Sequence, residues 1–372
     1  MKVPQFIPWI GKEEYKAIED CFTRQWITEG LKAKEFQASL LDYIGVSFGH
    51  FAPNGTLALY LALKSLGIGP GDEVLVSDFT FIASANAIEM VGAQPVFVDV
   101  CAGNYQIDCA IADRLISAQT KAIMPCHIFG TIGDMDRVGE FAKKHDLYII
   151  EDAAQAIGVR FKGRHAGTFG DVGVFSFFAD KLLTTAEGGF IGTNNEQLSE
   201  KLQLLRNQGR LERGTFIHPE IGYNFRITDL QCAIGIAQLK KINQIINRKL
   251  AIKKHYEQGL AGIDEVAFIQ PIEGADWVPF RVGILCQNAH ELMSFLQKRD
   301  IEPRSFFYPL HKQPCYDYLK KDKRWDDLYE DKNFSNSLFA YEHGICLPTF
   351  PTLTENQINY VCSTIKEFYG RK

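Results

Sequence analysis

The chain lacks the features that mark several large classes of protein. No stretch approaches the roughly 20 consecutive apolar residues that a membrane-spanning helix requires, so we expect no membrane association. The net charge of −5 gives no basic excess of the kind that attracts nucleic acid, although it is compatible with a small anionic ligand. The nine cysteines form no CxxC pair and no cluster with histidine. They predict reduced thiols in a cytoplasmic protein without a structural metal, with Cys126 and Cys346 in the core.

The composition indicates an ordinary folded protein with more than one domain. The hydrophobic fraction of 46% and the charged fraction of 23% are typical of globular chains and predict a sizeable core. A length of 372 residues is long for a single domain, and the sequence shows no internal repeat. We expect an N-terminal arm and a large domain over residues 1–248, followed by a smaller α+β domain over residues 249–372.

Apolar strands alternate with helices through the large domain. After arm helices at 13–26 and 33–43, the pattern predicts helices at 56–66, 80–91 and 135–145, and strands at 73–76, 95–98, 122–127, 147–150 and 172–177. Such alternation indicates an α/β fold, with a mostly parallel sheet covered by helices on both faces. A long helix from 228 to about 248 is expected to leave this domain, before a strand at 281–285 and helices at 291–299 and 355–368.

One lysine stands at the end of an apolar strand. Lys181 lies just beyond the strand predicted at 172–177, in a segment rich in aromatic and aliphatic residues. Burial beside such surface disfavours the charged ammonium, and an amine with a lowered pKa can attack a carbonyl carbon. Most lysines are solvated, so the alternative is an ordinary surface lysine at a strand end. The groups that surround Lys181 decide between a reactive amine and a solvated surface lysine.

Three further groups are expected at the same edge of the sheet, where α/β proteins bind ligands. Asn54, Gly55 and Thr56 open a helix, whose free N–H groups suit a phosphate, although an ordinary helix cap explains them too. Asp152 follows an apolar strand and would pair with a protonated ring nitrogen or cap a helix. Phe81 would lie flat on a planar ligand or pack in the core. Together with Lys181, this set matches the needs of pyridoxal phosphate.

Five motifs carry a resemblance to a known family. They are NGT at 54–56, FTFIASANAI at 79–88, EDAAQAIG at 151–158, GTFGDVGVFSFFADKLLTTAEGG at 167–189 and GYNFRITDLQCAIG at 222–235. With these motifs in this order, the chain resembles the sugar aminotransferases of the DegT/DnrJ/EryC1/StrS family over essentially its whole length. The resemblance implies the fold-type-I architecture of pyridoxal-phosphate-dependent transferases, with a smaller C-terminal α+β domain.

The resemblance also implies roles for the residues around the cofactor ring. Lys181 would carry the internal aldimine and then move a proton between the substrate carbon and the cofactor. Asp152 would pair with the pyridine nitrogen, and Gln155 would donate a hydrogen bond to the phenolic oxygen. Phe81 would stack on the ring.

The phosphate of the cofactor would be held from two chains. Gly55, Thr56 and Ser176 would bind it from within the subunit. Asn224 is expected to reach the cofactor phosphate of a partner across a two-fold axis, which implies a homodimer with shared active sites.

Other candidates belong to the substrate. Arg226 would bind the diphosphate of a nucleotide sugar, although a surface salt bridge explains it equally well. Tyr308 and His311 would line the sugar pocket, with a satisfied loop residue as the alternative for His311. His127, at the end of an apolar strand, has the same two interpretations.

The resemblance therefore implies a cytoplasmic aminotransferase with ping-pong kinetics. An amino acid, expected to be glutamate, would donate the amino group to a nucleotide-linked keto sugar. Many relatives have histidine in place of Phe178 and glycine in place of Ala186. The Phe177-Phe178 pair and the segment that begins at Arg304 instead resemble the perosamine synthase branch, which aminates a GDP-linked 4-keto-6-deoxy sugar.

Alternatives to this function stay open. Amination at C3 of the sugar or of a cyclitol would use the same residues. A binding or regulatory relative without turnover would share the fold, because fold alone does not determine function. Deoxygenating relatives replace the lysine with histidine, and Lys181 argues against their chemistry.

Overall fold

A seven-stranded sheet forms the centre of the protein. The computed structural model describes residues 1–372 except 211–213, 215, 322–327 and 372. In spatial order the strands are β1 (Phe48–Ala52), β9 (Gly189–Thr193), β8 (Val172–Ser176), β5 (Tyr148–Asp152), β4 (Thr120–Met124), β2 (Glu73–Ser77) and β3 (Gln94–Val98). All neighbouring pairs are parallel except the two that involve β9. The predicted mostly parallel α/β sheet is confirmed.

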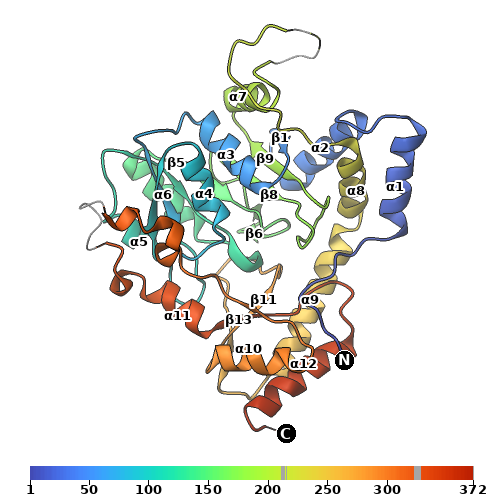
Figure 1. The fold of residues 1–372 in the computed structure, drawn as a ribbon, viewed down its shortest axis with the longest axis vertical. Helices are drawn as coiled ribbons and strands as arrows, with labels where there is room; N and C mark the ends of the chain where they lie inside the picture. Colours follow the sequence, from blue (N-terminus) through green and yellow to red (C-terminus); the bar gives the residue numbers. More distant parts are fainter. Residues whose placement is uncertain (211–213, 215, 322–327, 372) are drawn as a thin grey trace.

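Helices cover this sheet (Figure 1). They are α3 (Gly55–Ser65), α4 (Ala83–Met90), the short α5 (Cys109–Ala112), α6 (Met135–His145) and α7 (Glu196–Arg206). Because of this cover, every residue of β2 and β9 is buried, which explains why the centres of these strands are apolar. Cys126 and Cys346 are buried as predicted. Among the described residues, no helix is both long and apolar enough to cross a membrane.

The N-terminal arm packs against one helix of the large domain. Helices α1 (Lys12–Thr23) and α2 (Leu31–Ile44) both contact α8 (Asp229–Lys240). Sequence patterns predicted one helix over 228–248, and this was wrong. The chain leaves helical geometry at Lys241, with φ −108° and ψ 12°, and α9 (Ile242–Gly259) starts anew.

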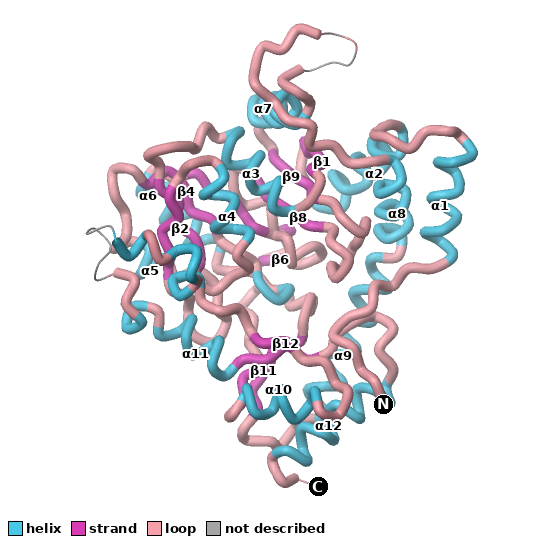
Figure 2. Tube along the Cα trace, viewed as in Figure 1, coloured by secondary structure: helices cyan, strands magenta, loops and turns pink. Residues whose placement is uncertain are grey.

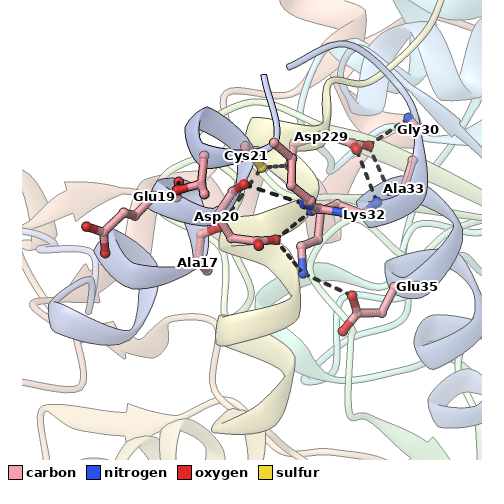
Figure 3. A network of polar contacts seen from close by, with 11 residues as sticks. Ala17, Glu19, Asp20, Cys21, Gly30, Lys32, Ala33, Glu35 and Asp229 are labelled. Carbon is pink, nitrogen blue, oxygen red and sulfur yellow. Dashed lines mark hydrogen bonds and ion pairs between the residues drawn. The ribbon is translucent and has the colours of Figure 1, made fainter. Parts of the chain in front are cut away.

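A carboxylate distant in sequence caps helix α2. The residue before α2 is Gly30, which has no side chain to cap the helix. Asp229 replaces it: Oδ1 accepts from the N–H groups of Gly30 at 2.7 Å and Ala33 at 3.0 Å (Figure 3). Its Oδ2 accepts from the Lys32 N–H at 3.1 Å. The arm is therefore held by the N–H groups that a helix start leaves without partners.

The C-terminal part has its own sheet, separate from the central one in Figure 2. Its antiparallel strands lie in the order β10 (Val266–Phe268), β11 (Val282–Cys286), β13 (Gly344–Leu347) and β12 (Arg304–Ser305). Helices α10 (Ala289–Gln297), α11 (Ser335–His343) and α12 (Glu355–Phe368) accompany it. Val3 packs into the apolar cluster of this part and pairs with Ile301. The predicted division between residues 248 and 249 falls within α9 and stays a prediction.

Small irregular elements complete the described chain. They are the hairpin strands β6 (Arg160–Phe161) and β7 (Arg164–His165), and single 3₁₀ turns at Ile128–Gly130, Leu310–Lys312, Pro314–Tyr316, Leu319–Lys321 and Asp331–Asn333. Sequence patterns did not predict β1, whose glycine and histidine are poor strand formers. Pairing with β9 at the sheet edge compensates for this.

Candidate active site

One cavity of about 400 Å³ is lined by residues of both sheets. Its walls come from the carboxyl ends of β5 and β8, the start of α3, and the segments around β11 and β12. The lining includes seven of the residues predicted from the sequence: Gly55, Thr56, Phe81, Asp152, Gln155, Ser176 and Lys181. The cavity lies at the edge of the sheet where α/β proteins bind their ligands.

Lys181 lies in an apolar and partly charged environment. Its Nζ is 4.5 Å from the centroid of the Phe280 ring. Burial lowers the pKa of Lys181, and the negative charges of Asp180 and Asp152 oppose this effect. Lys181 is therefore not the solvated surface lysine of the alternative interpretation. The amine of Lys181 therefore loses its proton more easily than a lysine in water, and the neutral amine is the form that acts as a nucleophile.

Asp152 is the last residue of β5 and is held by two hydrogen bonds. Its Oδ2 accepts from the Ser84 hydroxyl at 2.7 Å, and its Oδ1 accepts from the Ala154 N–H at 3.1 Å. Residues 153–158 form turns, so Asp152 caps no helix here. Ser84 escaped the sequence analysis, although its position three residues after Phe81 places both at one end of α4.

The start of α3 forms a cradle for an anion. Asn54 caps the helix by accepting the Leu57 N–H at 2.9 Å, and the first N–H groups have no acceptor within the helix. Ser176 lies beside them: a Cβ on Gly55 would approach the Ser176 Cβ to 2.9 Å. A Cβ on Gly189 would approach the Asn54 carbonyl oxygen to 2.4 Å. These two glycines therefore permit the close contact between α3 and the ends of β8 and β9.

Two side chains are suited to a planar ring. Gln155 accepts the Phe129 N–H at 2.8 Å through Oε1, so its amide nitrogen is the atom that can donate to a ligand. Phe81 is 58% exposed and lines the cavity. Its ring is thus not part of the core, which was the alternative interpretation, and can lie against a ligand.

Both histidines considered in the sequence have partners inside the protein. His127 Nε2 lies 2.9 Å from Oε2 of Glu151, and both side chains are buried. Glu151 also accepts N–H groups of the loop between β7 and β8. His311 Nδ1 lies 2.8 Å from Oδ2 of Asp78, and its ring stacks on Phe334. Nδ1 of His127 and Nε2 of His311 are nevertheless buried without a hydrogen-bond partner among the described residues, and His127 also lines the cavity. Both interpretations of these histidines therefore stay open.

Four predicted residues do not line this cavity within the chain. Asn224 accepts a hydrogen bond from Arg226 Nε at 2.7 Å, in the segment between α7 and α8. Tyr308 is partly exposed and contacts the ring of Tyr341. With His311, these are the four residues that are absent from the lining: Asn224, Arg226, Tyr308 and His311. The roles assigned to these residues stay predictions.

The cavity also contains charged residues that the sequence analysis did not assign to it. Arg281 Nη2 and Asp180 Oδ2 form a buried ion pair at 2.5 Å, and Arg304 lines the same wall. Asp180 directly precedes Lys181, whereas the two arginines are more than 100 residues away. Only the approach of the C-terminal sheet brings them together.

The residues present fit pyridoxal phosphate. The cradle at α3 suits its phosphate, and the fixed carboxylate of Asp152 suits a protonated ring nitrogen. Gln155 provides a donor, Phe81 provides a ring surface, and Lys181 provides an amine. Among the described residues, no group of His, Cys, Asp and Glu could hold a metal ion.

Comparisons with known proteins agree with this arrangement. The profile of the DegT/DnrJ/EryC1/StrS aminotransferase family matches residues 8–366. A GDP-perosamine synthase of Vibrio cholerae is 36% identical over 375 residues, which cover 99% of each chain. DesV of S. venezuelae, solved with a ketimine intermediate, superposes with a TM-score of 0.91 at 29% identity, covering 100% of this chain and 99% of DesV. Spr1654 of Streptococcus pneumoniae, solved in a PMP form, has a TM-score of 0.92 at 27% identity, covering 99% and 97%.

Proposed function

This chain belongs to the DegT/DnrJ/EryC1/StrS aminotransferase family, and from that membership we propose that it moves an amino group from an amino acid to a nucleotide-linked keto sugar. The cofactor is pyridoxal phosphate, as in this family. One observation carries the proposal: the Lys181 amine, the fixed carboxylate of Asp152 and the anion cradle of α3 converge in one cavity.

Each residue would have a separate task. Asp152, oriented by Ser84, would hold the proton on the ring nitrogen of the cofactor. Bound pyridoxal phosphate would supply an electron sink and carry the amino group between the two substrates. Lys181 Nζ would take the proton from the α-carbon of the donor and return a proton to the sugar carbon in the second stage. Its lowered pKa makes the neutral, proton-accepting form more accessible.

Phosphate and ring would be held by the remaining lining residues. Gly55, Thr56 and Ser176 would bind the phosphate, because α3 directs its first N–H groups towards that corner of the cavity. Gln155 would donate to the phenolic oxygen, and Phe81 would cover the ring.

Similarity to the GDP-perosamine synthase of Vibrio cholerae supports a GDP-linked 4-keto-6-deoxyhexose as the acceptor. We propose glutamate as the donor and two stages in the same cavity, in which the donor leaves before the sugar enters. Arg226 would contact the diphosphate, and Tyr308 and His311 would lie near the sugar. A cyclitol acceptor or amination at C3 would leave the residues around the cofactor unchanged, and NMR analysis of the product separates these reactions.

We propose a homodimer as the working unit. Asn224 does not line the cavity of its own chain, so it could reach a cofactor phosphate only in a partner. Described residues after α7 project from the body of the molecule (Figure 1), and among them Phe216, Ile217 and Ile221 are 88, 80 and 86% exposed. A cleft of about 770 Å³ beside α2, lined by Trp26 and other arm residues, offers further surface for association. Sedimentation analysis would measure the subunit number.

The proposal is tested by spectroscopy on the purified holoenzyme. The absorbance of the bound cofactor is recorded, glutamate is added, and a panel of nucleotide-linked keto sugars follows after removal of free glutamate. We expect glutamate to bleach the visible band and one sugar to restore it. A cofactor that binds but responds to no amino donor would instead indicate a binding relative without turnover.

A further inference from the structure

The wall of the cavity next to Lys181 carries an unassigned pair of arginines. We propose that Arg304, supported by Arg281, binds the carboxylate of the amino donor. This inference rests on the proposed function and specifies where one of the two substrates is held. The evidence lies in the hydrogen-bonding capacity of the two guanidinium groups, in their charge and in their place beside Lys181 in the lining of the cavity.

Asp180 brings the two arginines together. Its Oδ2 lies 2.5 Å from Nη2 of Arg281 and 3.9 Å from Nη1 of Arg304. The side chains of Asp180 and Arg281 are only 8 and 10% exposed, whereas that of Arg304 is 49% exposed. Arg281 is therefore a buried, fixed group, and Arg304 is the one that a ligand entering the cavity can reach.

The donors of Arg281 are largely engaged within the protein. One end of its guanidinium binds Asp180. The other end lies 3.1 Å from the side-chain oxygen of Gln5, in the amide orientation that satisfies both neighbours of Gln5. Arg281 can thus contribute positive charge to the cavity but few hydrogen bonds.

The side-chain N–H groups of Arg304 are available to a ligand. Its backbone is held in place, because β12 pairs with β13 opposite Cys346. Within the described residues, its side chain has the ion pair to Asp180 at 3.9 Å and a position over the Phe6 ring, 5.6 Å from the centroid, but no hydrogen bond. A guanidinium has five N–H donors in a planar fork, which matches the two oxygens of a carboxylate.

The charge of this wall also favours an anion. Two guanidinium groups face one carboxylate, which leaves one positive charge in excess at a partly desolvated site. A bound carboxylate would neutralise it.

Position favours the donor carboxylate over the diphosphate of the sugar substrate. Lys181 Nζ and the guanidinium carbon of Arg281 lie 4.5 and 4.6 Å from the same Phe280 ring centroid. In an amino acid the carboxylate is attached to the carbon that loses its proton to Lys181. In a nucleotide-linked 4-keto sugar the diphosphate is attached across the ring from the reacting carbon. Arg304 Nη1 lies 3.9 Å from Asp180, the residue that precedes Lys181, and Arg304 and Lys181 line the same cavity. The arginines are therefore placed near Lys181, where the donor carbon loses its proton.

The test compares Arg304→Gln, Arg304→Lys and the control Arg137→Gln in the holoenzyme. Arg137 is an exposed residue of α6 whose side chain is 78% exposed. For Arg304→Gln we expect KM for glutamate to rise about 10- to 100-fold, as for loss of a charged hydrogen bond, with KM for the keto sugar within about two-fold of wild type. In Arg304→Lys the KM for glutamate should rise less, because lysine keeps the positive charge but lacks the planar fork of N–H donors.

Calorimetry with glutarate provides a readout that does not depend on turnover. Glutarate has the carboxylates of the donor but no amine, and its affinity should fall in Arg304→Gln by a factor similar to the rise in KM for glutamate. An unchanged KM and glutarate affinity would overturn the inference, as would a rise confined to the KM of the sugar. Absence of amino transfer by the wild type would instead refute the proposed function itself.

Discussion

Ser84 donates its hydroxyl hydrogen to Oδ2 of Asp152 at 2.7 Å, and both side chains are buried. Among the described residues, the Ala154 N–H is the other hydrogen-bond donor to this carboxylate. We expect Ser84→Ala to weaken cofactor binding and lower kcat, by an amount equivalent to about 1.5–3 kcal/mol for a hydrogen bond to a charged group.

Titration of apoenzyme with pyridoxal phosphate and steady-state kinetics would measure this effect. The matched control is Ser39→Ala, which removes an exposed hydroxyl that donates to the Glu35 carbonyl on α2. Equal cofactor affinity and kcat in Ser84→Ala and wild type would show that Asp152 needs no support from α4.

Lys181→Ala should abolish turnover and leave the fold intact. Removal of the proton-transferring amine is expected to reduce kcat by at least about 10³-fold. Burial disfavours the charged form of Lys181, so its loss should not reduce the thermal stability of the apoenzyme. Amino transfer and thermal unfolding would be measured on the same preparation, and normal activity would refute the assigned role.

Asp229→Ala should release the N-terminal arm. The substitution leaves the N–H groups of Gly30, Lys32 and Ala33 without the carboxylate that caps α2 (Figure 3). Loss of such a cap is expected to lower the free energy of unfolding by about 1–2 kcal/mol. Urea denaturation would measure this, with Asp42→Ala, an exposed aspartate of α2, as the control. Equal midpoints for both variants would contradict the capping role.

Stability should depend on pH through Lys249. Its Nζ donates to the carbonyl oxygens of Phe280 at 3.0 Å and Thr349 at 2.7 Å, and burial lowers its pKa to about 7. An unfolded lysine keeps its proton to about pH 10. Between these values the unfolded state binds more protons, so the stability that Lys249 contributes rises with pH, by at most about 1.4 kcal/mol per pH unit.

The comparison that isolates this effect is wild type against Lys249→Met, by chemical denaturation at several pH values from neutral to alkaline. The stability of wild type relative to the variant should increase with pH. Lys240→Met, at an exposed position of α8, should show no such trend. A difference that stays constant with pH would mean that Lys249 remains charged in the folded protein.

Much of the fold is determined by local sequence patterns. The helices at 135–145 and 355–368 have the predicted bounds, because their apolar faces and capping residues are local signals. The strands of the central sheet are apolar runs, and most were predicted within a few residues. The break between α8 and α9 at Lys241 was not predicted, because the residues on both sides of it favour a helix.

For the site, the sequence by itself determined which residues stand at strand ends and helix starts. Lys181, Asp152 and Gly55 follow or precede apolar runs, and parallel strands bring their carboxyl ends to one edge. Only the tertiary structure decided what those residues contact. Ser84 meets Asp152, and Arg281 and Arg304 meet Asp180, across 68, 101 and 124 positions of the chain. The Ser84 contact depends on how α4 packs on the central sheet, and the arginine contacts depend on how the two sheets approach each other. No local pattern encodes such packing.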